Sequence, residues 1–167
     1  SIIGPGCVVN VEQFFKEIEE LKEGGIDTDG LVFIAKNAHI ITQNHIEEEA
    51  KEKLYQEGLN YFKSGDYFEA HESWEDLWSN FYLEDRKFIQ GLIQLSVSFV
   101  HLERGNMNGA KSLLNKSIEK FQLFSGVHRN VNLESLVRQI KVVSLAYDKI
   151  ESPNDFDWNL VPDLEII

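Results

Sequence analysis

Side chains that could bind a ligand or transfer a proton are concentrated in the middle of the chain. His71 and Glu75 are four residues apart, so a helix would place an imidazole and a carboxylate on one face. Further along, Gln90, Gln94 and His101 recur at helical spacing, which adds two amides and a second imidazole on one face of another helix. Such groups can hold a metal ion, take part in acid–base chemistry, or bind a polar ligand.

These side chains fall on two consecutive predicted helices, over residues 66–80 and 83–104. Helices joined by a short turn normally lie antiparallel and pack face to face. We therefore expect the two polar stripes to meet in apolar surroundings, where they must bond to one another or to a ligand. The candidate binding residues, which include one further carboxylate and one indole, are His71, Glu72, Glu75, Trp78, Gln90, Gln94 and His101.

Three interpretations of this cluster are open. A metal ion could be held by His71 and Glu75, which have the spacing of two ligands on one helix, with His101 as a third. A carboxylate and an imidazole dehydrated by neighbouring tryptophans could instead act as acid and base, although no nucleophile motif accompanies them. The third interpretation is a buried hydrogen-bond network that fixes the register of the two helices. The residues do not identify a cofactor.

Composition excludes several classes of protein. The formal net charge of −12, from 16 basic and 28 acidic residues, argues against non-specific binding of nucleic acid. The content of hydrophobic residues, 43% of 167, supports a folded domain with a sizeable core. A single cysteine, Cys7, excludes an intrachain disulfide framework and a multi-cysteine zinc site.

No predicted element is suited to crossing a membrane. The most apolar stretch, near residues 88–100, is interrupted by glutamines and serines and is shorter than the roughly 18 apolar residues that a span needs. No signal-peptide pattern opens the sequence, so we expect a cytoplasmic protein.

Residues 46–167 predict a mainly α domain, an up-and-down bundle of about five helices. The predicted helices cover residues 46–64, 66–80, 83–104, 107–124 and 133–150, with a loop over residues 126–131. The third helix is the most apolar and should be the central one. Asp66 and Asn132 are the expected N-caps, and Gly91 and Ser98 should permit a close helix crossing. The irregular tail should contact the bundle through Phe156 and its aromatic neighbour Trp158.

A weak internal repeat supports paired helical hairpins. Residues 62–78 align with residues 102–118 at an offset of 40, which pairs Gly65 with Gly105. A helix, a glycine turn and a second helix with a small alanine at the crossing follow the logic of tetratricopeptide hairpins. Two units are too few for a solenoid.

Residues 1–45 predict a separate β-α-β appendage. Residues 2–11 and 31–42 are rich in β-branched residues, with a turn at Gly4-Pro5-Gly6, and the helix between them ends at Gly24-Gly25. Two strands cannot cover both of their own faces. We expect this unit to pack on the helical domain, to be poorly ordered, or to pair its edge with a partner chain, which would produce a homodimer.

The segments IIGPGCVVNVEQFFKEIEELKEGGI and LVFIAKNAHIITQNH, residues 2–26 and 31–45, resemble one stretch of adenylosuccinate synthetase. The phosphate-binding glycine loop and the substrate segment of that family do not occur in this sequence, so the resemblance implies no activity. Purine-nucleotide binding is nevertheless one hypothesis that it raises.

Residues 54–125 resemble the DUF309 family. The resemblance rests on Gly65-Asp66-Tyr67-Phe68-Glu69-Ala70-His71-Glu72, on Glu75 and Trp78, on Phe88-Ile89-Gln90-Gly91-Leu92-Ile93-Gln94, and on His101, Gly105-Asn106 and Gly109-Ala110. It implies an all-α bundle and no assigned activity. Members of this family occur in bacteria, including cyanobacteria, and in plastids, which makes the plastid stroma an alternative location.

We therefore predict a non-catalytic helical module that binds a ligand or a protein partner, which could be a second copy. The alternative is an enzyme, such as a metal-assisted hydrolase, that uses His71 and Glu75.

Overall fold

The computed structural model describes residues 2–3, 8–25, 33–34, 39–41 and 43–164. Cys7 and the turn predicted at residues 4–6 lie outside them. The described part of the chain is mainly helical, as predicted, with six α-helices and three short strand pairs. Tertiary contacts divide the chain into two compact units, residues 1–52 and 53–167.

In the described part of the first unit, a helix lies between short strands, and a second helix begins at Gln43 before the unit ends. The strands are β1 (Ile2–Ile3), β2 (Val8–Asn10), β3 (Phe33–Ile34) and β4 (His39–Ile41), and the helix is α1 (Val11–Glu23). β1 pairs with β3 and β2 pairs with β4, both in parallel. The described strands lie within the two ranges predicted to be extended, residues 2–11 and 31–42. α1 ends as predicted, with Gly25 at a φ of 82°.

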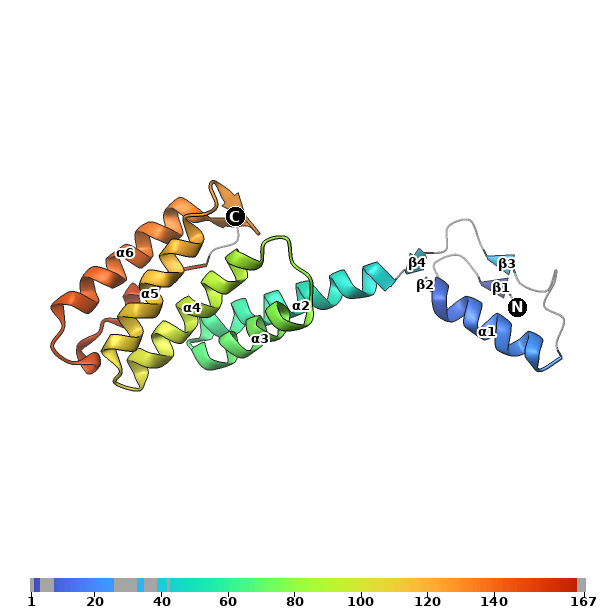
Figure 1. Ribbon diagram of the computed structural model, residues 1–167, viewed down its shortest axis with the longest axis horizontal. Coiled ribbons are helices and arrows are strands. Elements are labelled where there is room, and N and C mark those ends of the chain that lie inside the picture. The colour runs from blue at the N-terminus through green and yellow to red at the C-terminus, as the bar shows by residue number, and fades with distance from the viewer. Residues whose placement is uncertain (1, 4–7, 26–32, 35–38, 42, 165–167) are drawn as a thin grey trace. The chain divides into compact units, whose positions relative to one another are not determined.

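The second unit is built from helices that follow one another along the chain. After α2 (Gln43–Ser64), which contains the boundary between the units, come α3 (Tyr67–Asn80), α4 (Arg86–Glu103), α5 (Met107–Phe121) and α6 (Leu133–Lys149). α3 contacts α4, α4 contacts α5 and α5 contacts α6, and Figure 1 shows these four helices side by side in chain order. A hairpin of β5 (Val127–His128) and β6 (Val131–Asn132) precedes α6.

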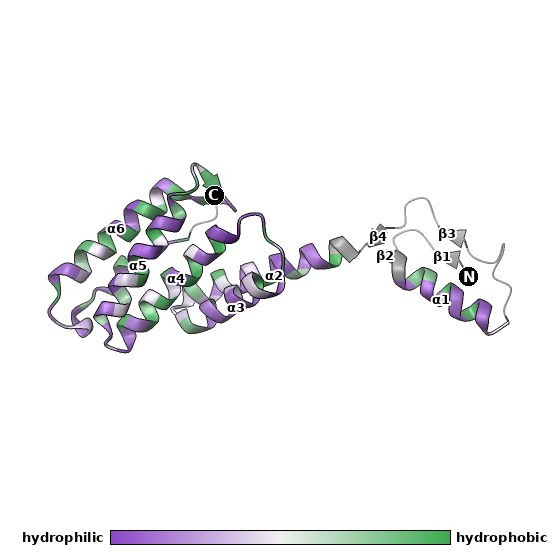
Figure 2. Ribbon diagram, viewed as in Figure 1, coloured by the Kyte–Doolittle hydropathy of each residue, from purple (hydrophilic) through white to green (hydrophobic). Residues whose placement is uncertain are grey.

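The core of the second unit surrounds α4, the helix that the sequence predicts to be central. Phe88, Leu92 and Phe99 on α4 are fully buried, and so is Trp74 on α3. Hydrophobic and hydrophilic residues alternate along each helix in Figure 2, as amphipathic helices require. The structure confirms Trp74 as a core residue, while Trp78 is partly buried at the edge of the core. Among the described helices, none has the length and apolar composition needed to cross a membrane.

The internal repeat is visible as two turns of the same geometry. Gly65 and Gly105 have φ angles of 85° and 75°, in the left-handed region that favours glycine. In both turns the amide after the glycine bonds back five residues: Asp66 N to Tyr61 O at 2.9 Å, and Asn106 N to His101 O at 2.8 Å. The turns between α2 and α3 and between α4 and α5 therefore have the same type of glycine C-cap.

The predicted caps are half right. Asn132 caps α6 by accepting a hydrogen bond from Ser135 N at 2.9 Å. Asp66 occupies the N-cap position of α3, but its side chain makes no capping bond. The predicted position of the cap is therefore confirmed and the predicted side-chain bond is not formed, while the Asp66 carbonyl accepts the first helical bond, from Ala70 N at 3.0 Å.

The C-terminal tail is tied to the bundle, as predicted. It contains two short 3-10 helices, η1 (Pro153–Asp155) and η2 (Trp158–Leu160). Phe156 is 4% exposed, and the Trp158 ring stacks on Tyr67 with centroids 5.9 Å apart. Aromatic contacts therefore fix the tail against α3.

Candidate functional site

His71 and Glu75 lie on α3 with their side chains on the same side. His71 Nε2 is 3.9 Å from Glu75 Oε2, and the two side chains are 22% and 48% exposed. His71 Nδ1 lies 3.0 Å from Glu72 Oε1, but the contact lacks hydrogen-bond geometry, so this nitrogen has no bonded partner. The imidazole is thus partly buried, and both carboxylates face solvent.

The glutamines and His101 lie on α4 but are not bonded to α3. His101 turns toward the start of α5, where its Nδ1 is 3.1 Å from Asn106 Nδ2 and its ring lies against Gly109. Among the described residues, no hydrogen bond or ion pair joins His71 or Glu75 to either glutamine or to His101. The predicted network across the helix pair is therefore not formed.

The rotation of α4 explains this difference. A Cβ atom on Gly91 would lie 2.9 Å from the Phe121 ring, and Ser98 Oγ donates a hydrogen bond to Ala110 O at 2.8 Å. These contacts confirm the predicted close crossing and place it between α4 and α5. Because α4 presses its small residues onto α5, His101 on the same side is directed to α5 rather than to α3.

The metal candidates do not converge. Within the described ranges, no three histidine, cysteine, aspartate or glutamate side chains lie close enough together to hold one ion. His71 and Glu75 could supply two ligands, whereas the His101 ring is held against α5. The described side chains thus offer a pair of ligands rather than a set of three.

Three of the seven candidate residues carry a buried polar atom without a hydrogen-bond partner. These atoms are Nδ1 of His71, Nε1 of Trp78 and Oε1 of Gln94. Buried polar atoms are nearly always bonded in folded proteins, so each exception requires an explanation. By helical position, His71 and Trp78 lie three residues before and four residues after the fully buried Trp74 on α3, so they flank its core side, and Gln94 on α4 lies four residues before the fully buried Ser98.

Arg86, the first residue of α4, and Arg104, the residue that follows its last turn, each lie over an aromatic ring of α3. The guanidinium of Arg86 lies 3.8 Å from the centre of the Trp78 ring, and that of Arg104 lies 5.7 Å from the centre of the Phe68 ring. We call His71 and Trp78 of α3, together with Gln94 of α4, the α3–α4 face.

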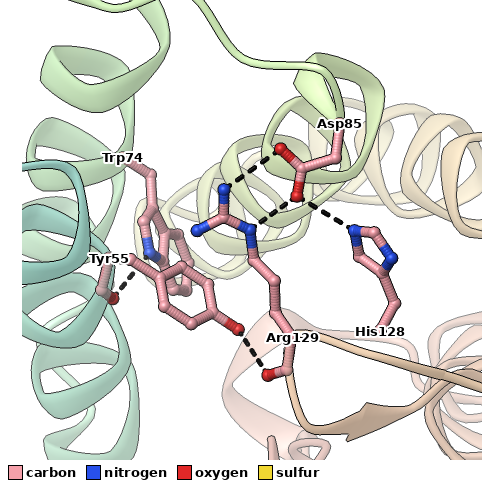
Figure 3. Close-up of polar contacts among 5 residues, drawn as sticks. All are labelled: Tyr55, Trp74, Asp85, His128 and Arg129. Carbon is pink, nitrogen blue, oxygen red and sulfur yellow. Dashed lines mark hydrogen bonds and ion pairs between the residues drawn. The ribbon is translucent and has the colours of Figure 1, made fainter. Parts of the chain in front are cut away.

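The best-connected polar cluster in the described chain was not predicted. Asp85, the residue before α4, receives bonds from the β5–β6 hairpin, as Figure 3 shows. Arg129 donates from Nε to Oδ2 at 2.5 Å and from Nη2 to Oδ1 at 3.1 Å. His128 Nε2 lies 2.9 Å from Oδ2 and must be the donor to an ionised carboxylate. We call Asp85, His128 and Arg129 the carboxylate clasp.

The turn of the β5–β6 hairpin holds His128 and Arg129 where they can donate to Asp85. Arg129 and Asn130 have φ angles of 44° and 63°, the left-handed pair that a two-residue hairpin requires. The His128 ring packs edge-on against Phe88, with centroids 4.7 Å apart. The prediction of a loop over residues 126–131 was therefore wrong in part, because these residues include a strand pair. The signal in the sequence is Arg-Asn between Val127 and Val131, since asparagine tolerates this conformation.

The clasp is connected to the core through α2. Tyr55 Oη donates to the backbone carbonyl of Arg129 at 3.3 Å, and the Arg129 guanidinium lies 4.8 Å from the centre of the Tyr55 ring. Trp74 Nε1 in turn donates to the Tyr55 carbonyl at 3.2 Å (Figure 3). Burial alone would raise the pKa of Asp85, but the hydrogen bonds from Arg129 and His128 outweigh it and lower the pKa below its usual value.

A second group of carboxylates lies where the α2–α3 turn meets the end of α4. Burial raises the pKa of Glu103; Arg104 opposes the increase, and the charges of Glu69 and Asp66 add to it. Burial, and then the charge of Glu103, raises the pKa of Tyr67 to about 12. The negative charges here repel one another.

Two cavities lie away from the α3–α4 face. One, of about 580 Å³, is walled by Tyr67 and Trp158 and bordered by Lys63 and Asp163. The other, of about 320 Å³, lies between the end of α5 and the start of α6. Neither is lined by any of the seven candidate residues.

Comparison with known families gives two separate matches. The family described as Domain of unknown function (DUF309) matches residues 55–113. The family described as Adenylosuccinate synthetase matches residues 1–62.

Individual relatives divide in the same way. The adenylosuccinate synthetase of Pyrenophora tritici-repentis is 49% identical over 45 residues, which are 27% of this chain and 11% of that protein. An uncharacterized protein of Aquifex aeolicus is 21% identical over 158 residues, 91% of this chain and 47% of that protein. The uncharacterized protein YpuF of Bacillus subtilis is 30% identical over 105 residues, 62% of this chain and 60% of that protein.

The chain therefore spans about a tenth of the synthetase and about half of the Aquifex protein. Both resemblances seen in the sequence are confirmed: residues 55–113 match DUF309, a family of unknown function, and the N-terminal residues match a fragment of adenylosuccinate synthetase.

Proposed function

We propose that residues 46–167 are a non-catalytic helical module that binds a ligand or a protein partner on the α3–α4 face. Residues 1–45 are an appendage that resembles a fragment of the synthetase. The observation that supports this role is the set of three buried, unbonded polar atoms on His71, Trp78 and Gln94. For Trp78 and Gln94, leaving the atom unbonded costs about 1–3 kcal/mol of stability, and costs of this kind are retained mainly where function requires them, whereas His71 Nδ1 has the Glu72 carboxylate 3.0 Å away.

The chemistry of these atoms defines the ligand. Trp78 Nε1 can only donate a hydrogen bond and Gln94 Oε1 can only accept one, while His71 Nδ1 can do either. A group that offers both an acceptor and a donor would satisfy them. The carboxamide and the peptide bond are such groups, so the module is suited to an amide-containing ligand or an exposed stretch of peptide backbone.

The indole N–H signals in a nitrogen-correlated NMR spectrum test this proposal. The chain has three tryptophans, and the Trp74 indole, which is fully buried and bonded to Tyr55 O, is an internal control. Titration with N-acetylglycinamide should shift the Trp78 signal and leave the Trp74 signal in place. A Trp78 signal that moves no more than that of Trp74 would contradict the proposal.

The match to adenylosuccinate synthetase supports a second candidate, purine-nucleotide binding by the N-terminal unit. Inosine monophosphate and GTP at about millimolar concentration should then raise the melting temperature, since a ligand stabilises the state that it binds. An unchanged melting temperature with both nucleotides would remove this candidate and leave the helical module unaffected.

A further inference from the structure

Positive charge is concentrated in one part of this acidic chain. Residues 86–149 contain ten lysines and arginines against four aspartates and glutamates, although the whole chain has a net charge of −12. On α6, Arg138 and Lys141 are exposed, and neither makes an ion pair with any residue that the structure describes, although the carboxylate of Glu134 lies close enough to Arg138 to feel its charge. Exposed cations of this kind attract an acidic partner.

These cations border an apolar groove. The cavity of about 320 Å³ between α5 and α6 is lined by Phe121, Phe124, Leu133 and Val137, with Gln122, Glu134, Arg138 and Lys141 at its rim. Glu134 is the acidic member, and its carboxylate accepts a hydrogen bond from Gly126 N at 3.0 Å. We call this cavity and its two cations the basic groove. It is suited to an apolar side chain flanked by carboxylates.

A matching group is present on α3 of the same chain. Phe68 is 45% exposed, and Asp66 and Glu69 beside it are exposed. Within the described part of the chain, neither carboxylate has an ion-pair partner, and the charge of Glu103 lies close to both. We call Asp66, Phe68 and Glu69 the acidic anchor. A cation brought to it would relieve the repulsion between these carboxylates.

We propose that the chain associates head to tail, with the acidic anchor of one copy bound in the basic groove of the next. The Phe68 ring enters the cavity, and Asp66 and Glu69 face Arg138 and Lys141. The Phe68 ring borders the α3–α4 face, since its centre lies 5.9 Å from that of His71, but the association uses a different partner and different charges and goes beyond the ligand binding proposed above.

The arrangement of the helices favours an open assembly. α3 and α6 lie at opposite ends of the row of helices from α3 to α6 (Figure 1). A two-fold contact through either surface alone would bring like charges together. A head-to-tail contact pairs unlike charges and leaves a free surface at each end, so assemblies grow with concentration.

Light scattering of the full chain after size exclusion tests the proposal. The mass should rise above that of the monomer with concentration at low salt, and should fall as salt screens the charges. Phe68→Ala should weaken the association about tenfold or more, as loss of a central apolar anchor does. Lys116→Glu, which reverses an exposed charge elsewhere on α5, is the matched control and should change the mass little.

A charge exchange makes the test specific. Asp66→Lys with Glu69→Lys, and Arg138→Glu with Lys141→Glu, should each give a monomer when studied alone. An equimolar mixture of the two double variants should associate again, because each anchor then meets a groove of opposite charge. This recovery also shows that both variants are folded. The proposal is overturned by a monomer at every concentration, by association that survives both double variants, or by a mixture that stays monomeric.

Discussion

Arg129, in the turn of the β5–β6 hairpin, donates two hydrogen bonds to Asp85, the residue before α4. The two residues are 44 positions apart in the sequence, so this pair fixes the hairpin to the start of the most buried helix. Asp85 is 14% exposed and Arg129 is 22% exposed, so the pair is largely shielded from solvent. Such a pair is costly to break, because the remaining charge stays partly buried.

Asp85→Ala should therefore lower the free energy of unfolding by about 2–4 kcal/mol, through the loss of the acceptor for both Arg129 and His128. Urea denaturation followed by circular dichroism measures this. Asp148→Ala is the matched control, since its pair with Lys111 is exposed and should contribute at most about 1 kcal/mol. Equal effects of the two variants would contradict a special role for the clasp.

The same carboxylate should make stability depend on pH. Because the folded-state pKa of Asp85 is below the usual value of 3.8, the folded state favours the ionised form. The contribution of the Asp85 carboxylate to stability is complete above its pKa in the unfolded state. It is lost as the pH falls through its pKa in the folded state. Stability of the unaltered chain should therefore decrease below about pH 4 more steeply than that of Asp85→Asn. Parallel curves in urea titrations between about pH 2 and pH 6 would refute this assignment.

Gly58→Ala should be among the most damaging single substitutions. The added Cβ would overlap Nε1 of Trp74, inside a fully packed core, and would displace the indole from Tyr55 O. We expect a loss of about 3 kcal/mol or more, or failure to fold. Gly91→Ala, whose closest contact is 2.9 Å to the Phe121 ring, should cost less. Thermal melts of the two variants would show which loses more stability. An unchanged melting temperature for Gly58→Ala would be inconsistent with this packing.

Gln94→Leu should stabilise the fold while it impairs recognition. The substitution replaces an unbonded buried acceptor with an apolar side chain of similar length, so a gain of about 1 kcal/mol is expected. The Trp78 response to N-acetylglycinamide should weaken in the same variant. Asn115→Leu, on the exposed side of α5, controls for added apolar surface. A destabilised Gln94→Leu would mean that the amide has a structural role.

Zinc and manganese should change the melting temperature little, since the described side chains offer two metal ligands in His71 and Glu75 rather than three. Melts with each ion and with a chelator measure this. A large stabilisation that His71→Ala abolishes would instead favour the metal-assisted hydrolase that the spacing of these two residues allows.

The helices of residues 46–167 could be predicted closely because amphipathic spacing and glycine turns are local signals. α3 begins and ends within one residue of the prediction, and Asn132 caps α6 as expected. The predicted hydrogen bonds between the two polar stripes are not formed, and the direction of His101 toward α5 has a cause that is not local. The rotation of α4 is set by Gly91 and Ser98 against α5, and spacing alone does not say which neighbour a glycine faces.

The carboxylate clasp could not be found by the same reasoning. His128 and Arg129 are adjacent in an irregular stretch, and their partner lies more than forty residues earlier. Only the left-handed turn of Arg129 and Asn130 directs both donors to one carboxylate. A loop of polar residues gives no such indication unless its turn type is recognised first.

The order of the helices has a consequence for how the second unit is assembled during folding. Because each of α3 to α6 contacts the next along the chain, most of its structure forms from nearby segments, and such topologies fold rapidly. The clasp is an exception, since it joins Asp85 to residues more than forty positions later in the sequence, and both segments must be in place before it can form. We expect it to close late, after the helices have docked.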